Sequence, residues 1–289
     1  MIQGQEFRLE VDGLTYAGLL WGDPESPLVL ALHGWLDNAL SFAELAPRLH
    51  GYRVLSLDLS GHGYSSHRSP DATYNIWDDL PQLEAIVSEL TSEPVTLIGH
   101  SRGATIATLL AAVLGERCSR LVMIDGLMPG FMDQRNAGSQ LKSFVFERNK
   151  YRARPPRFFA SVEEFAQRRL QYGFTTESAH ALAPRALEHG SQGYRLLSDT
   201  RLYGASATWL DPIKRAQIYA SVTAPVLGIF AERGLFANSE TAQKMLEDAG
   251  AALPDFRSLV MAGSHHLHME AGVLDRMVQR VDQFLRTGQ

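Results

Sequence analysis

The sequence predicts an α/β fold in which helices cover a mostly parallel central sheet. Short apolar runs rich in Val, Leu and Ile alternate with longer segments whose apolar residues recur at helical spacing, which indicates strand–helix–strand crossovers. The 289-residue chain is 45% hydrophobic and 20% charged, which is enough apolar material for a large core and too little charge for a disordered chain. We find no repeat at periods of about 20–50 residues.

The first 125 residues carry the strand–helix alternation. Two runs with polar and apolar residues in alternation predict an antiparallel pair with a turn at Gly13, and four further runs predict buried strands. The predicted strands are 6–11, 14–20, 28–33, 53–59, 95–100 and 119–125. The predicted helices between them are 38–49, 76–90 and 104–115.

After Asp125 the pattern changes. Residues 126–218 show helical segments, including 161–173 and 176–190, and no convincing strand. The alternation then resumes with strands at 225–230 and 256–263 and helices at 239–250 and 269–285. We therefore expect a core made of residues 1–125 and 219–289, with residues 126–218 inserted as a helical cap, or lid, after the sixth core strand.

Composition restricts the location and the partners. The single cysteine, Cys118, allows no internal disulfide, and the formal net charge of −5 argues against a nucleic-acid binder. No apolar run reaches the ~20 residues that span a bilayer, and the N-terminus shows no secretory signal. We expect a cytoplasmic protein without stable membrane insertion. Its oligomeric state has no signal in the sequence.

A candidate nucleophile lies in Gly-His-Ser-Arg-Gly, residues 99–103. A predicted buried strand runs into this motif and a predicted helix runs out of it, which is typical of a sharp turn that presents a serine hydroxyl. Gly99 and Gly103 would relieve crowding around Ser101. The N–H of Arg102 would stand at a helix N-terminus, where free donors can stabilise an oxyanion. A serine that merely caps the helix is the alternative.

A serine hydroxyl needs a base near neutral pH, and the chain has 10 histidines. Where the nucleophile occupies such a turn, the base comes last in the chain. His265 directly follows Gly263 and Ser264, between the last predicted strand and the last predicted helix, so we predict it as the base. A zinc site of His265, His266 and His268 is the competing interpretation, but the sequence offers no second group of ligands.

Several motifs together resemble the α/β-hydrolase superfamily. They are His33-Gly34-Trp35, the DLSGHG turn at 58–63, GHSRG at 99–103 and GSHHLHME at 263–270. The segments LHGWLDNALSF, GHGYSSH and GSHHLHME are most similar to the serine hydrolase-like proteins. The resemblance implies that Ser101 is the nucleophile, that His265 is the base and that the backbone N–H of Trp35 is a second oxyanion donor. It also implies that the insertion at 126–218 is the lid of this family.

The sequence departs from the superfamily at the triad acid. The commonest position, about four residues after the predicted strand 225–230, holds Gly234. Asp125 ends the preceding strand at the same edge of the sheet, and some members of the superfamily take their acid from there. Glu232 lies close to the usual position but two residues early. We predict Asp125 as the acid and leave Glu232, or no acid at all, as alternatives.

These residues predict a serine hydrolase that cleaves a small carboxylic ester or thioester through an acyl-enzyme intermediate. The implied partner is a small-molecule acyl substrate, and the chemistry requires no metal or organic cofactor. Two alternatives stay open. One is other chemistry at the same site, as in a C–C hydrolase, a lyase or a cofactor-free peroxidase. The other is a catalytically silent binding protein, which the missing acid near Gly234 suggests.

Two features of the inserted segment bear on the substrate. Its aromatic residues could line an acyl pocket, although such residues more often belong to a core. They are Phe131, Phe144, Phe146, Phe158, Phe159 and Trp209. Residues 148–157 carry five basic residues and no acid, for which a solvated loop is the preferred interpretation and an anionic substrate or membrane surface the alternative.

Overall fold

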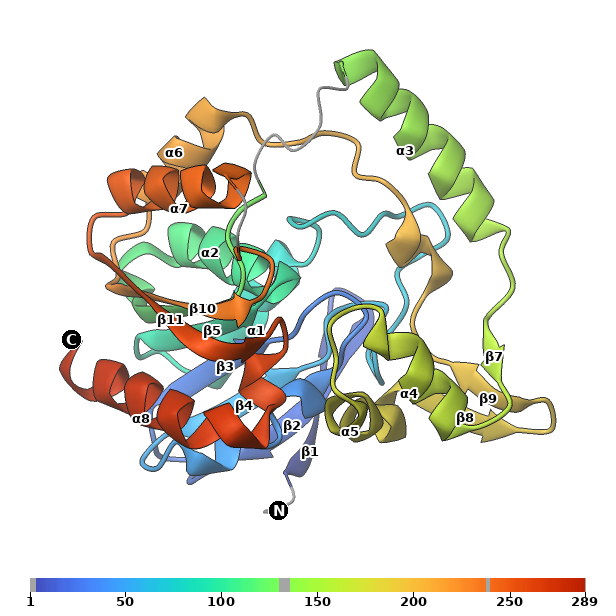
Figure 1. The fold of residues 1–289 in the computed structure, drawn as a ribbon, viewed down its shortest axis with the longest axis horizontal. Coiled ribbons are helices and arrows are strands. Elements are labelled where there is room, and N and C mark those ends of the chain that lie inside the picture. The colour runs from blue at the N-terminus through green and yellow to red at the C-terminus, as the bar shows by residue number, and fades with distance from the viewer. Residues whose placement is uncertain (1–3, 130–135, 238–239, 289) are drawn as a thin grey trace.

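The computed structural model describes residues 4–129, 136–237 and 240–288. Within these ranges eight strands form one sheet. Their bounds are β1 (Gln5–Val11), β2 (Leu14–Trp21), β3 (Leu28–Leu32), β4 (Arg53–Leu57), β5 (Val95–His100), β6 (Cys118–Ile124), β10 (Val226–Arg233) and β11 (Phe256–Ser264). The spatial order is β1-β2-β4-β3-β5-β6-β10-β11, with β1 and β2 antiparallel and the other six strands parallel to one another (Figure 1). The predicted α/β fold with a mostly parallel sheet is confirmed.

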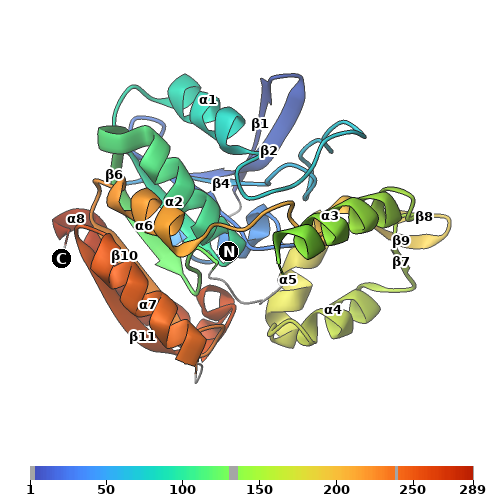
Figure 2. The ribbon, with the colours of Figure 1, turned by 90° about the horizontal axis from the view of Figure 1, so that it is seen from above.

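Helices cover both faces of this sheet. One face packs against α1 (Leu80–Leu90), α2 (Arg102–Leu114), α6 (Pro212–Ala220) and α7 (Glu240–Ala252). The other face packs against α8 (Ala271–Thr287) and the short 3₁₀-helices η1 (Ala39–Phe42) and η2 (Ala46–Arg48) (Figure 2). Because both faces are covered, β3 and β5 are buried at every residue, as the continuous apolar run at 28–33 predicted for β3. No helix in the described ranges is long and apolar enough to cross a bilayer.

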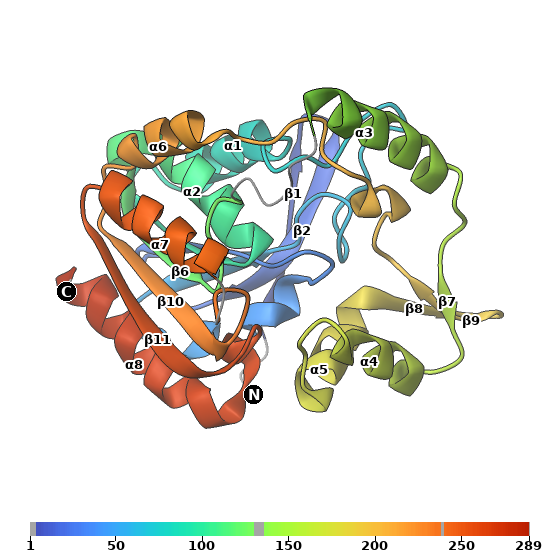
Figure 3. The same cartoon turned by 45° about the horizontal axis from the view of Figure 1, so that its top comes forward.

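The segment between β6 and β10 contains α3 (Ala137–Arg152), α4 (Val162–Leu170) and α5 (Thr176–Ala186), which lie beside the sheet core (Figure 3). The prediction that it has no strand is wrong. Three short strands, β7 (Phe158–Phe159), β8 (Leu187–Gly190) and β9 (Gly193–Leu196), form a small antiparallel sheet in the order β7-β9-β8. They are too short for a two-residue periodicity to be visible in the sequence.

Proline explains most of the differences in helix bounds. The predicted helix 38–49 is two 3₁₀ turns, because Pro47 has no N–H to donate and would clash with the turn before it. The helix predicted from residue 76 begins at Leu80, with Pro81 in its first turn, where the missing N–H costs nothing. The helix predicted to reach residue 190 ends at Ala186, two residues after Pro184.

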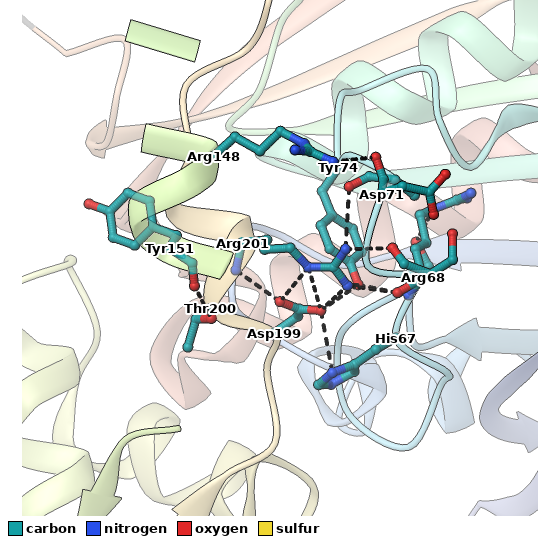
Figure 4. A network of polar contacts seen from close by, with 12 residues as sticks. His67, Arg68, Asp71, Tyr74, Arg148, Tyr151, Asp199, Thr200 and Arg201 are labelled. Carbon is teal, nitrogen blue, oxygen red and sulfur yellow. Dashed lines mark hydrogen bonds and ion pairs between the residues drawn. The ribbon is translucent and has the colours of Figure 1, made fainter. Parts of the chain in front are cut away.

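A polar network joins the inserted segment to the loop at residues 67–74 (Figure 4). Asp199 accepts a hydrogen bond from the Tyr74 hydroxyl at 2.8 Å and pairs with Arg201 at 2.7 Å. Arg201 also donates to the backbone carbonyls of Ser69 and Arg68, at 2.6 and 2.7 Å. These contacts hold Tyr74 in a fixed position, which matters for the cavity described below.

Candidate active site

The sharp turn after β5 is built as its sequence predicted. Ser101 has φ 52° and ψ −118°, a conformation that a side chain rarely adopts, and α2 begins at the next residue. A Cβ on Gly99 would lie 2.4 Å from the Gly103 carbonyl oxygen, and a Cβ on Gly103 would lie 2.0 Å from the Leu32 carbonyl oxygen. Only glycine fits at either position, so the two glycines allow the strand and the helix to meet at the strained serine.

Asp125 directly follows β6, at the same edge of the sheet. Its side chain is fully buried and its φ is 39°, a second strained residue beside the first. The carboxylate accepts the backbone N–H groups of Ala231 at 3.0 Å and Leu235 at 2.9 Å. These bonds satisfy the buried charge and fix the direction in which the remaining lone pairs point.

His265 follows the last residue of β11 and lies between the two other side chains. Its Nδ1 is 2.6 Å from Oδ2 of Asp125, and its Nε2 is 3.0 Å from Oγ of Ser101. The partners are 140 and 164 residues away in sequence. The structure thus brings together the three predicted residues in the order serine, imidazole, carboxylate, with hydrogen-bond distances at both steps.

Gly234 explains why the usual acid position carries no side chain. A Cβ built on this residue would lie 2.3 Å from Oδ2 of Asp125, so the carboxylate of Asp125 fills the space that a side chain at position 234 would need. Glu232 lies in the extended β10, is exposed, and its carboxylate makes no hydrogen bond or ion pair with the residues that the structure describes. Asp125 is therefore the carboxylate that reaches His265.

A buried group of charged and aromatic residues supports His265 from behind. His100 Nε2 is 2.9 Å from the His265 carbonyl oxygen, and the His100 ring lies against the rings of His265 and His266. Asp37 pairs with Arg169 at 2.5 Å and lies 3.6 Å from His266. Burial alone would raise the pKa of Asp37, but its contacts with His100, His266 and Arg169 hold that pKa well below its usual range. The sequence carried no signal for Asp37 or Arg169.

Ring nitrogens of His100, His265 and His266 lie within 4.8 Å of one another, a grouping that could hold a metal ion. The zinc set considered from the sequence is different, since His268 lies 2.7 Å from Oγ of Ser41 instead. Both nitrogens of His265 are already within hydrogen-bond distance of Asp125 and Ser101. A metal ion held by His265 would therefore compete with one of these two contacts.

The two predicted oxyanion donors flank Ser101. Trp35 lies in the loop after β3, and Arg102 is the first residue of α2. Among the described residues, no acceptor hydrogen-bonds to the backbone N–H of either. Both residues line the same cavity as Ser101, so two free donors are available there.

Two cavities meet at Ser101. The first has a volume of about 500 Å³ and is lined mainly by apolar residues, among them Trp77, Leu127, Trp209 and Met245. The second, of about 480 Å³, is more polar and includes Arg169, Arg233 and His265. Of the aromatic residues proposed from the sequence, Trp209 lines the first cavity, whereas Phe131 lies outside the described residues. The other four, Phe144, Phe146, Phe158 and Phe159, do not line either cavity.

The basic segment 148–157 is partly a helix. Its first five residues form the end of α3, and the loop prediction holds only for the remainder. Arg148 donates to the Asp71 carbonyl oxygen at 2.6 Å, so it joins the inserted segment to the loop of Figure 4.

The burial of His266 should make the folded protein less stable at acidic pH. Burial is the main cause that lowers its pKa to about 4, and the nearby His100 and His265 lower it further. Below pH ~6.5 the unfolded chain binds a proton at this residue that the folded chain does not, so stability falls as the pH drops from ~6.5 to ~4. We expect His266→Gln to reduce the loss of unfolding free energy between pH 7 and 4.5 by about 2 kcal/mol.

Urea unfolding of both proteins across this pH range measures the difference. His50→Gln, at an exposed position, is the matched control for exchanging a histidine for glutamine and should change the unfolding free energy at pH 7 little. If the unfolding free energies of the wild type and of His266→Gln changed in parallel with pH, the prediction would be contradicted.

Comparison with known proteins agrees with the fold and the motifs. The family model for the alpha/beta hydrolase fold matches residues 27–272. A serine hydrolase-like protein of Dictyostelium discoideum is 28% identical over 283 residues, covering 92% of this chain and 78% of that protein. The crystal structure of a hypothetical protein from Pseudomonas aeruginosa is 35% identical with a TM-score of 0.89, covering 97% of this chain and 99% of that chain.

A thioesterase domain from the curacin biosynthetic pathway is also similar, with 25% identity and a TM-score of 0.82, covering 96% of this chain and 99% of that chain. The sheet order, the strained serine between β5 and α2 and these similarities point to the same conclusion. The chain belongs to the α/β-hydrolase superfamily, with similarity to its serine hydrolase-like proteins.

Proposed function

We propose that this chain hydrolyses small carboxylic esters or thioesters through an acyl-enzyme on Ser101. The observation that carries the proposal is the unbroken contact from Ser101 through His265 to Asp125, with 3.0 Å and 2.6 Å separations. A serine alone is a weak nucleophile, whereas a serine that shares its proton with an oriented imidazole can attack an acyl carbon.

In the first half-reaction, Oγ of Ser101 bonds to the acyl carbon while its proton passes to Nε2 of His265. Asp125 accepts a hydrogen bond from Nδ1, which keeps the imidazole in the tautomer that can take this proton and stabilises the imidazolium that forms. The imidazolium then gives its proton to the departing alcohol or thiol. In the second half-reaction, water attacks the acyl-enzyme by the same route, and Ser101 regains its proton.

The oxyanion of each tetrahedral intermediate would accept hydrogen bonds from the backbone N–H groups of Trp35 and Arg102. Removal of one such donor costs about 3–4 kcal/mol of transition-state stabilisation in enzymes of this type. The strain at Ser101 supports this role, because the same tight turn that exposes the hydroxyl places the first amide of α2 next to it.

The two cavities suggest how the substrate lies. We assign the acyl group to the apolar cavity of about 500 Å³ and the leaving group to the polar cavity of about 480 Å³. Residues 126–218 would act as the lid, since Ser206, Thr208 and Trp209 of that segment line the acyl cavity. The similarity to a thioesterase domain favours keeping thioesters within the proposed substrate class.

The structure weakens the sequence argument for a catalytically silent protein. That argument rested on the missing side chain at Gly234, and the carboxylate of Asp125 occupies this space and contacts His265. The contacts of His265 with Ser101 and with Asp125 therefore support ester hydrolysis.

Activity-based labelling tests the proposal. We expect a fluorophosphonate probe to label the wild-type chain at Ser101, as located by peptide mass spectrometry. We also expect turnover of 4-nitrophenyl esters and acyl thioesters, compared over a series of acyl lengths. Labelling without ester or thioester turnover would instead favour C–C hydrolase, lyase or peroxidase chemistry at the site. No labelling and no turnover would contradict the proposed mechanism.

A further inference from the structure

We propose that the side chain of Arg102 selects acyl groups that carry a carboxylate. This inference rests on the proposed hydrolase function and refines its substrate class. The substrates would be half-esters or half-thioesters of dicarboxylic acids, with the free carboxylate held by the guanidinium. Water would cleave the acyl–oxygen or acyl–sulfur bond, so the products are a dicarboxylate and an alcohol or thiol.

Arg102 is the one charged residue among the described residues that line the acyl cavity. The other lining side chains are aliphatic, aromatic or hydroxyl-bearing, and none is a carboxylate. An apolar cavity with a single cation favours a ligand with an apolar body and one anionic group. A purely hydrocarbon acyl chain would leave that cation without a counter-ion when it displaced the solvent.

Arg102 is partly buried, and its guanidinium has no acidic partner among the described residues. By contrast, the buried arginines Arg169, Arg185 and Arg215 lie 2.5, 2.6 and 3.5 Å from a carboxylate oxygen. Arg102 donates from Nη2 to the Tyr74 carbonyl oxygen at 2.6 Å, its buried Nε has no hydrogen-bond partner, and it forms no ion pair with a described residue. Burial lowers the pKa of Arg102, which reflects an environment that disfavours its charge.

The nearest acidic residues are engaged elsewhere. Asp79 pairs with Arg68 at 3.0 Å and accepts the Tyr16 hydroxyl at 2.6 Å. Asp78 accepts hydrogen bonds from Thr73 and from the backbone N–H of Asn75. Their charges act on Arg102 without direct contact, so a carboxylate that entered the cavity would be its first ion-pair partner.

Arg102 is also held in place before any ligand arrives. Its acceptor Tyr74 belongs to the network of Figure 4, where the Tyr74 hydroxyl bonds to Asp199 and the Tyr74 ring lies under Arg201. A guanidinium has five N–H donors, and one of them is used by Tyr74. A fixed cation with free donors loses little entropy on binding, which is the condition for selective recognition of a carboxylate.

Matched ester pairs test the inference. For acyl chains of increasing length, each 4-nitrophenyl alkanoate is compared with the 4-nitrophenyl half-ester in which a carboxylate replaces the terminal methyl group. At one chain length we expect the wild type to favour the half-ester in kcat/KM by about 10- to 100-fold, the usual effect of one charge-assisted contact. In Arg102→Gln, which removes the positive charge, that ratio should fall to about one or below, mainly through KM.

Arg102→Lys keeps the charge and should retain part of the preference, whereas Arg233→Gln, in the polar cavity, should leave the ratio as in the wild type. Inhibition of the wild type by free dicarboxylates, compared with monocarboxylates of equal length, needs no variant and should follow the same length dependence. Equal kcat/KM for both members of every pair, or a ratio that Arg102→Gln does not change, would overturn the inference. Fluorophosphonate labelling of Ser101 in the same samples separates this outcome from a failure of the proposed function.

Discussion

Ser101→Ala is expected to lower kcat for the best ester substrate by about 10⁴- to 10⁶-fold. The alanine variant keeps the cavity, the oxyanion donors and His265, so the remaining rate would come from water attack in a preorganised site. Stopped-flow or steady-state kinetics with 4-nitrophenyl esters measure the change in kcat. Circular dichroism and the thermal midpoint verify that the fold at this strained residue is retained.

His265 and Ser101 should act as one catalytic unit. We expect His265→Ala to cost about as much as Ser101→Ala, and the double variant to cost little more than either, because each removes the same proton transfer. Ser206→Ala changes a second serine that lines the same cavity and should retain most of the activity. Comparable losses in Ser206→Ala and Ser101→Ala would contradict the assignment of the nucleophile.

Asp125→Asn is expected to lower kcat by about 10⁴-fold while the protein stays folded. In the wild type, Oδ1 of Asp125 accepts the N–H of Ala231, whereas Oδ2 accepts that of Leu235 and contacts Nδ1 of His265. An asparagine has one amide oxygen, so when this oxygen keeps the contact with Ala231, the amide loses the contact with Leu235 and presents N–H rather than an acceptor to Nδ1 of His265. The imidazole would be held in the tautomer that cannot accept the serine proton. Glu232→Gln is the control and should leave kcat close to the wild-type value, since Glu232 is exposed and its carboxylate makes no contact with His265. A loss confined to Glu232→Gln would show that the acid is misassigned.

The position of the acid can also be moved. Gly234→Asp alone should destabilise the fold, because its Cβ would meet the Asp125 carboxylate at 2.3 Å. Asp125→Gly removes this obstacle and tolerates the positive φ at residue 125. We expect the double variant Asp125→Gly with Gly234→Asp to fold better than Gly234→Asp and to recover part of the activity lost in Asp125→Gly. No recovery in a folded double variant would contradict the idea that both positions reach the same point beside His265.

Much of the fold could be predicted from the sequence because its signals are local. The continuous apolar run of β3 indicates a strand covered on both faces, and the helical spacing of α8 identifies the last helix. The three short strands of the inserted segment were missed because two to four residues are too few to show a period. The predicted cap at 126–218 also includes most of α6, which packs on the sheet core beside α2 and α7.

The candidate site divides in the same way. Gly99 and Gly103 mark the strained turn at Ser101 in the sequence itself, since a Cβ at either position would meet backbone atoms. Asp37, Arg169 and the uncharged lining around Arg102 have no such local mark. They matter through contacts between segments that are separate in the sequence, such as that of Arg169 with Asp37 across 132 residues.

The sequence by itself determined the order of the strands along the chain, the turn that presents Ser101 and the histidine that follows β11. Each of these depends on the steric and hydrogen-bonding preferences of neighbouring residues. Only the tertiary structure decided which carboxylate meets His265, because Asp125 and Gly234 compete for one volume that neither residue's neighbours reveal. It also decided that Arg102 faces a cavity without an acid, since the pairing of a buried charge depends on every segment that surrounds it.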